Sequence, residues 1–180
     1  MRYVALLRGI NVGGNRRVEM PRLKSAFENA GFKDVVTYIN SGNVVFSAPK
    51  NDTLFYAGKI EKAVEKEFGF LVETLIIGGP RFEKICQDIP LEWTNDSRQR
   101  TDVLFVWNDI SIDHAIQNII TNPDVDEIVA SDGAIIWHLD RQNLSQSKMK
   151  DLIKNPLYKQ MTVRNSNTVR KLFDMINRSS

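Results

Sequence analysis

The sequence predicts an α+β protein whose two halves repeat one order of elements: strand, helix, strand, strand, helix, strand. Apolar runs of strand length alternate with stretches in which apolar residues recur at helical spacing. Two turn sequences, Ser41–Asn43 and Ser131–Gly133, each join two β-rich runs as in a hairpin. The simplest fold for this order is a pair of tandem ferredoxin-like βαββαβ halves with antiparallel sheets, plus a C-terminal helix.

The first half is expected to span residues 1–77. Its strands are predicted over Arg2–Arg8, Asp34–Asn40, Val44–Ala48 and Phe70–Ile77. Pro21 suits the first turn of a helix, and Gly31 ends that helix after four apolar residues at helical spacing. Asp52 is a suitable cap for a second helix, which Gly69 ends.

A connector over residues 78–100 is expected to hold a short helix around Phe82–Gln87 and then a polar stretch. The second half then spans residues 101–180. Its strands are predicted over Thr101–Trp107, Val125–Ala130, Ala134–Leu139 and Gln160–Arg164. Because each half alone is small for independent stability, we expect the two halves to pack together.

The helices of the second half are predicted from capping residues and apolar spacing. Ser111 is a suitable cap for the first of them. Ser145 is expected to open the second, with Met149, Leu152 and Ile153 facing inward. A last amphipathic helix closes the chain.

The composition is that of an ordinary globular protein, with 42% hydrophobic and 26% charged residues. No apolar run reaches the roughly 18–20 residues of a membrane helix, and the N-terminus lacks the features of a signal peptide. The single cysteine, Cys86, agrees with a reducing compartment. We therefore expect a cytoplasmic protein that does not engage membranes.

The charge is uneven along the chain although the total is only +2. Residues 1–72 carry 11 basic and 7 acidic side chains, residues 73–140 carry 4 and 13, and residues 141–180 carry 9 and 2. The basic ends and the acidic middle can attract one another, within the chain or between chains. Alternatively, the two basic ends form a surface for an anionic ligand.

The most informative prediction is a binding site at one end of the first sheet. In the predicted topology, the loop after the first strand and the first hairpin lie at the same end. The residues there offer backbone amides, guanidinium groups and side-chain amides, which suit phosphate or carboxylate. The candidate residues are Arg8, Asn11, Gly13, Gly14, Ser41 and Asn43, with further donors on Arg16, Arg17 and Asn40. The alternative interpretation is a plain strand-to-helix connection with solvated side chains.

Three segments form a distinctive set of motifs: Tyr3–Arg17 (YVALLRGINVGGNRR), Val36–Phe46 (VTYINSGNVVF) and, near the C-terminus, Thr162–Asn165. They resemble the motifs of a bacterial family of unknown function, domain-of-unknown-function family 1697. The resemblance implies the paired ferredoxin-like fold, adds Arg164 and Asn165 to the candidate site, and implies no activity. The chain departs from the family pattern at Ser166, where an aromatic residue is common, and at Asn15, where lysine is common.

Other functions have less support in the sequence. Whether the protein is an enzyme stays open, since no general base or nucleophile stands out, and no cofactor is expected. His114 and His138 are not at metal-ligand spacing, so no metal site is expected. A nucleic-acid-binding module is disfavoured, because the total charge is small and strands lack the run of aromatic residues that stacks on RNA. An assembly module without a small ligand, including a homodimer, is a further alternative.

Overall fold

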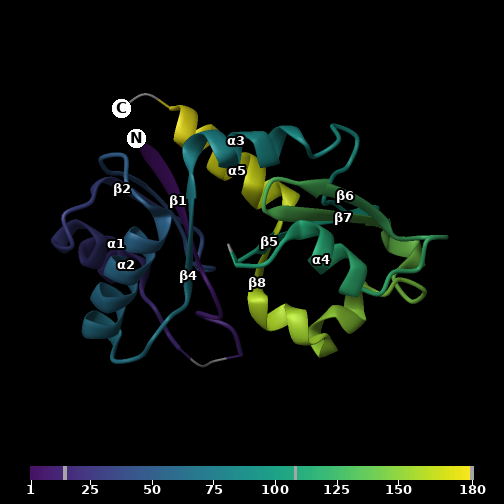
Figure 1. Cartoon of the computed structure of the whole chain (residues 1–180), viewed down its shortest axis with the longest axis horizontal. Coiled ribbons are helices and arrows are strands. Elements are labelled where there is room, and N and C mark those ends of the chain that lie inside the picture. The colour runs from purple at the N-terminus through teal and green to yellow at the C-terminus, as the bar shows by residue number, and fades with distance from the viewer. Residues whose placement is uncertain (14–15, 108, 179–180) are drawn as a thin grey trace. The chain divides into compact units, whose positions relative to one another are not determined.

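The protein has a mixed α+β fold with two four-stranded antiparallel sheets and helices (Figure 1). The computed structural model describes residues 1–13, 16–107 and 109–178. By its internal contacts the chain divides into Met1–Phe82 with Leu172–Ser180, here called unit 1, and Glu83–Lys171, here called unit 2.

Unit 1 contains the first sheet, with strand order β2-β3-β1-β4. The strands are β1 (Arg2–Leu7), β2 (Lys33–Tyr38), β3 (Asn43–Ser47) and β4 (Thr74–Gly78). Strand β1 is central and pairs antiparallel with both β3 and β4, so that Ala5 lies opposite Val44 on one side and Ile76 on the other. The apolar runs predicted from the sequence therefore form the middle of the sheet.

Helices α1 (Met20–Asn29) and α2 (Thr53–Phe68) pack on this sheet. As predicted, Asp52 caps α2: its side chain accepts a hydrogen bond from Leu54 N at 3.0 Å. Gly69 ends α2 in the left-handed conformation. The apolar face of each helix meets an aromatic cluster that contains Phe27, Phe46 and Tyr56. Because the apolar residues at helical spacing are the ones that this core buries, the two helices could be predicted from the sequence.

Unit 2 contains the second sheet, with strand order β6-β7-β5-β8. The strands are β5 (Gln99–Val106), β6 (Glu127–Ser131), β7 (Ala134–Asp140) and β8 (Met161–Asn165). Helix α4 (Ile112–Asn118) begins at the predicted cap, because Ser111 accepts a hydrogen bond from His114 N at 3.1 Å. A core that includes Leu104, Trp137 and Met161 lies between the sheet and the segments that cover it.

The prediction of a single helix that begins at Ser145 is wrong. In its place lie three short 3-10 helices, η1 (Arg141–Asn143), η2 (Met149–Lys154) and η3 (Pro156–Gln160). The residue that bonds the start of η2 is Ser147, whose Oγ accepts from Met149 N at 3.0 Å. With three residues per turn, Met149 and Leu152 share one buried face, whereas Ile153 lies off that face and is 69% exposed.

Helices α3 (Gly79–Gln87) and α5 (Ser166–Asn177) each begin in one unit and end in the other. The sequence placed all of the C-terminal helix in the second half, whereas the structure groups its residues from Leu172 onward with unit 1. One contact within unit 1 joins the two ends of the chain: Arg2 Nη1 donates to Met175 O at 3.0 Å. In the described part of the chain, no helix combines the length and the apolar character that crossing a bilayer requires.

Candidate functional site

The loop after β1 and the hairpin between β2 and β3 meet at one end of the first sheet. Leu7 N donates to Gly42 O at 2.8 Å, and Asn11 Nδ2 donates to Asn40 O at 2.8 Å. These bonds join segments about 30 residues apart, as the topology predicted. The two segments of the candidate site in unit 1 are therefore neighbours.

Asn11 holds the loop in place. Its Oδ1 accepts from Val18 N at 2.8 Å, and its Nδ2 donates to Val18 O as well as to Asn40 O, both at 2.8 Å. The amide of Asn11 thus imitates a paired strand residue for Val18 and ties the far end of the loop to the hairpin. Asn11 was predicted from the sequence to bind a ligand, whereas in the structure its side-chain amide forms hydrogen bonds with the backbone of Val18 and Asn40.

The loop and hairpin contain an unusual number of left-handed backbone residues. Positive φ is found in this region at Gly9, Asn11, Gly13, Arg16, Ile39 and Gly42. For a β-branched residue such as Ile39, with φ of 46°, this conformation is costly. Strained backbone of this kind gathers at binding and catalytic sites, where the surrounding structure holds it.

Three of the other predicted residues make contacts within unit 1. Arg8 Nη1 donates to Glu73 Oε2 at 3.0 Å in an ion pair. Asn43 is fully buried, and its Nδ2 donates to Ser41 Oγ at 3.1 Å and to Tyr38 O at 3.2 Å. Asn43 therefore supports the hairpin.

Both glycines of the Gly13-Gly14 pair were predicted to approach a ligand. Gly13 is exposed and has a φ of 63°. Among the described residues, no atom outside its neighbours lies within 4 Å of the position that a Cβ would take there. Gly14 and Asn15 lie outside the described residues.

A hollow of about 650 Å³ lies beside the loop and the hairpin in unit 1. It is lined by Asn11, Arg17, Val18, Glu19, Met20, Pro21 and Asn40. The Arg17 side chain is 85% exposed and lies 4.0 Å from Glu19. The start of α1 forms part of the lining, and the Glu19 side chain makes no capping bond to it. This helix start was not among the predicted site residues, although Pro21, shortly after the loop, indicates where the helix begins.

The remaining predicted residues, Arg164 and Asn165, belong to unit 2. Arg164 is buried, Nη1 donates to Thr162 Oγ1 and to Val163 O at 2.8 Å, and burial lowers its pKa to about 10. Asn165 Oδ1 accepts from Thr168 N at 2.9 Å and so caps α5. As successive strand residues, Arg164 and Asn165 point to opposite faces of the sheet. A single site shared with the unit 1 loop remains a prediction.

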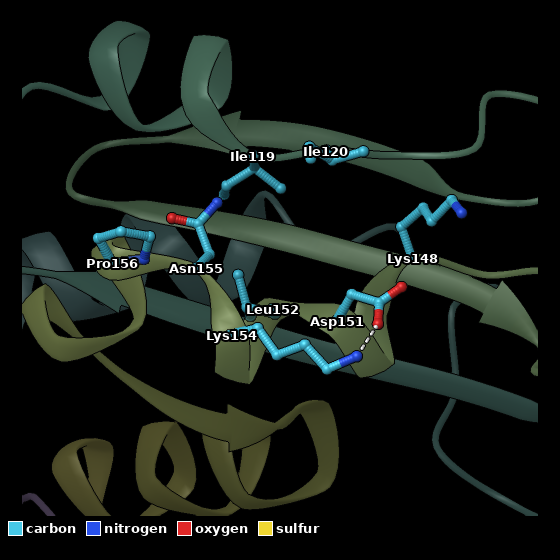
Figure 2. Close-up of a pocket in the computed structure, with 8 residues that line it drawn as sticks. All are labelled: Ile119, Ile120, Lys148, Asp151, Leu152, Lys154, Asn155 and Pro156. Carbon is cyan, nitrogen blue, oxygen red and sulfur yellow. Dashed lines mark hydrogen bonds and ion pairs between the residues drawn. The ribbon is translucent and has the colours of Figure 1, made fainter.

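Unit 2 has hollows of its own beside η2. One, of about 390 Å³, lies between Ile119 and Ile120 on one side and Leu152 on the other (Figure 2). An ion pair between Asp151 and Lys154, 3.0 Å apart, lies on its rim (Figure 2). A second, of about 490 Å³, lies against β5 and β8 and includes Asn165 in its lining. Neither hollow was predicted from the sequence.

These features define a two-unit α+β protein with a strained, Gly-rich loop beside a polar hollow. The model of the family described as protein of unknown function (DUF1697) matches residues 1–137, and the chain belongs to this family, as its motifs predicted. The chain is similar to the solved structure of the conserved bacterial protein SP0830 from Streptococcus pneumoniae, with 28% identity and a TM-score of 0.82 over 98% of each chain. No curated protein gives a significant match.

Proposed function

We propose that unit 1 binds a small anionic ligand, with a phosphate or carboxylate group, in the hollow beside the loop. The observation that carries this proposal is the meeting of Arg17, the start of α1 and the strained loop around one hollow. The three hydrogen bonds of the Asn11 side chain hold the loop in this strained conformation. Strain that is maintained in this way is typical of binding sites.

The lining suits an anion for electrostatic reasons. The N-terminus of a helix carries a partial positive charge and unpaired backbone N–H groups, and α1 has no acidic residue in its first turn. Arg17 adds a guanidinium that can bind two oxygens of a phosphate or carboxylate. Glu19, at the N-cap of α1, carries a negative charge that repels an anion in the hollow. Removal of the Arg17 charge should therefore weaken anion binding, and removal of the Glu19 charge should strengthen it.

Replacing Arg17 by Gln should weaken phosphate binding about tenfold, because a charge-assisted hydrogen bond contributes roughly 1.5–3 kcal/mol. Replacing Glu19 by Gln should strengthen binding about two- to fivefold, since one surface charge changes the energy by roughly 0.2–1 kcal/mol. Calorimetric titration with inorganic phosphate and with small phosphate esters measures both effects. Arg178→Gln, an exposed arginine of unit 1 away from the hollow, is the matched control.

Equal affinities of the wild type, the Arg17 variant and the Glu19 variant would refute the proposal, as would the absence of binding to any phosphate tested. A loss of binding in the Arg178→Gln control as well would point to general charge attraction instead of a site.

Tyr3, an aromatic residue of the central strand β1, is not available to stack on a nucleic-acid base. Tyr3 is 1% exposed and packs within unit 1 against Phe46, at 5.5 Å between ring centroids, and Tyr56, at 5.2 Å. A base cannot stack on a ring that is enclosed in this way. We expect no single-stranded RNA or DNA to bind more tightly than about 10 μM near physiological salt. Fluorescence anisotropy at two salt concentrations tests this, and sub-micromolar binding that weakens steeply with salt would contradict it.

We further infer that each half is ferredoxin-like and that the chain arose by duplication. The orders β2-β3-β1-β4 and β6-β7-β5-β8 are equivalent when the second set is renumbered, which supports this inference. Cys86, a buried cysteine that forms no disulfide within the described residues, agrees with residence in the reducing cytoplasm.

A further inference from the structure

The second sheet is covered differently from the first, and a cavity lies where the cover differs. In unit 1 the segment between β3 and β4 is the continuous helix α2, whose Tyr56, Ile60 and Val64 are buried in the core. In unit 2 the corresponding segment between β7 and β8 is broken into η1, η2 and η3. The cavity of about 490 Å³ lies between η2, η3 and strands β5 and β8. Its volume is within the range of roughly 300–1,000 Å³ found for small-molecule sites.

The polar part of this cavity contains a buried acid. Asp102 is 7% exposed, and its Oδ2 accepts from Arg100 Nε at 2.9 Å and pairs with Nη2 at 2.8 Å. From the described residues, no donor reaches the second carboxylate oxygen, Oδ1. Oδ1 is accessible at the surface of the cavity and can accept a further hydrogen bond, so it is a position where a ligand N–H or ammonium group would be favourable.

Donors lie on the same lining. Within the described part of the chain, Arg100 Nη1 makes no hydrogen bond. Lys150 Nζ donates to Ser145 O at 2.7 Å and has two further N–H groups. Asn165, opposite Asp102 in the strand ladder, uses its Oδ1 for Thr168 and has its amide N–H groups left. These groups suit a carboxylate.

The rest of the wall is apolar and is formed by Leu104, Met149, Leu152 and Val163. We propose that the cavity binds a small zwitterion with an apolar body, such as an apolar α-amino acid or a dipeptide of such residues. The ammonium group binds Asp102 Oδ1, and the carboxylate binds Arg100 and Lys150. A simple anion would leave Asp102 Oδ1 without a partner, and a simple cation would face the two basic side chains. This site is separate from the one proposed in unit 1.

Calorimetric titration of the full chain with L-leucine and L-leucyl-L-leucine tests the proposal. The matched analogues are isocaproate, which is leucine without its ammonium group, and isoamylamine, which is leucine without its carboxylate. We expect leucine or the dipeptide to bind about tenfold more tightly than either analogue, because each lost group removes a charge-assisted hydrogen bond. Failure of both zwitterions to bind, or equal binding of isocaproate, would overturn the proposal.

Two variants locate the ligand. Asp102→Asn should remove the preference for leucine over isocaproate, whereas Asp124→Asn, at an exposed acid of unit 2, should leave that preference unchanged. Ile153→Trp should narrow the cavity and weaken binding at least tenfold without loss of folding, since Ile153 is 69% exposed.

Ile120→Trp is the control for that substitution, because Ile120 is 71% exposed and lines the neighbouring hollow instead (Figure 2). Should Ile120→Trp abolish binding while Ile153→Trp does not, the ligand would occupy the neighbouring hollow and the proposal would be wrong. The same conclusion follows if Asp102→Asn folds and keeps the full preference for leucine.

Discussion

Replacing Gly42 by Ala should lower the free energy of unfolding by about 3–5 kcal/mol. Gly42 has a φ of 74°, where an L-residue is strained. An added Cβ would also lie 2.8 Å from the Cβ of Leu7 and 2.9 Å from Cδ1 of Ile10. Neither neighbour can yield easily, because both are buried and Leu7 N donates to Gly42 O. Urea denaturation monitored by circular dichroism measures the loss.

The matched control is Gly13→Ala. Gly13 has nearly the same φ, 63°, but no described atom beyond its neighbours lies within 4 Å of an added Cβ. Only the backbone strain applies there, so we expect a loss of about 1–2 kcal/mol. Equal losses in the two variants would show that the close approach of Gly42 to β1 contributes nothing to stability.

Replacing Asp126 by Ala should destabilise unit 2 by about 3–5 kcal/mol, because several buried donors would lose their acceptor at once. Asp126 is 7% exposed. Its Oδ1 accepts from Ser147 Oγ at 2.5 Å, and its Oδ2 accepts from Asn122 N at 2.8 Å and Lys148 N at 3.0 Å. The carboxylate therefore ties the loop before β6 to the residues that begin η2. Thermal unfolding measures the loss, and Asp124→Ala, an exposed change two residues away, should alter stability by less than about 0.5 kcal/mol.

The same carboxylate should make stability depend on pH. Burial acts to raise the pKa of Asp126, but the hydrogen bonds from Ser147 and the backbone N–H groups of Asn122 and Lys148 outweigh burial and lower that pKa below its ordinary value of 3.8. The folded state therefore gains stability above the unfolded value and loses it as the pH falls toward the lower, folded value. Asp126→Asn should flatten this acid loss, and an unchanged acid profile would show that the hydrogen bonds do not favour the charged form.

Much of the fold could be predicted because the two sheets are built from apolar strands and their turns have distinctive residues. The hairpins at Ser41–Asn43 and Ser131–Gly133, and the caps Asp52 and Ser111, are local features that the structure keeps. Turns and helix caps depend on residues that are adjacent in the chain, so a single sequence is enough to predict them.

The segment after β7 shows where this approach fails. Met149 and Leu152 have the i, i+3 spacing that an α-helix and a 3-10 helix share, and only the exposure of Ile153 separates the two. Ser147, whose Oγ accepts from Met149 N, is itself bonded to Asp126, which is 21 residues away. A contact of that range leaves no periodic signal in the sequence.

The candidate site was predicted by residue type, and residue type does not distinguish binding from support. Asn11 and Asn43 were proposed because amides suit ligands, yet both are bonded to the backbone of the loop and hairpin. The lining of the hollow also includes Glu19, whose negative charge gives no reason to predict it in an anion-binding site. The buried acid Asp102 was missed because its burial depends on the pairing of β5 and β8.

The discontinuity of unit 1 has a consequence for synthesis on the ribosome. Unit 2 is one continuous stretch, Glu83–Lys171, whereas unit 1 needs residues on both sides of it. The main-chain oxygen of Met175 that receives the Arg2 side chain is therefore made only after the whole of unit 2. At roughly 5–20 residues per second, the nascent first sheet waits on the order of 5–20 s for this partner. The speed of translation through unit 2 thus sets how long the Arg2 side chain lacks this contact.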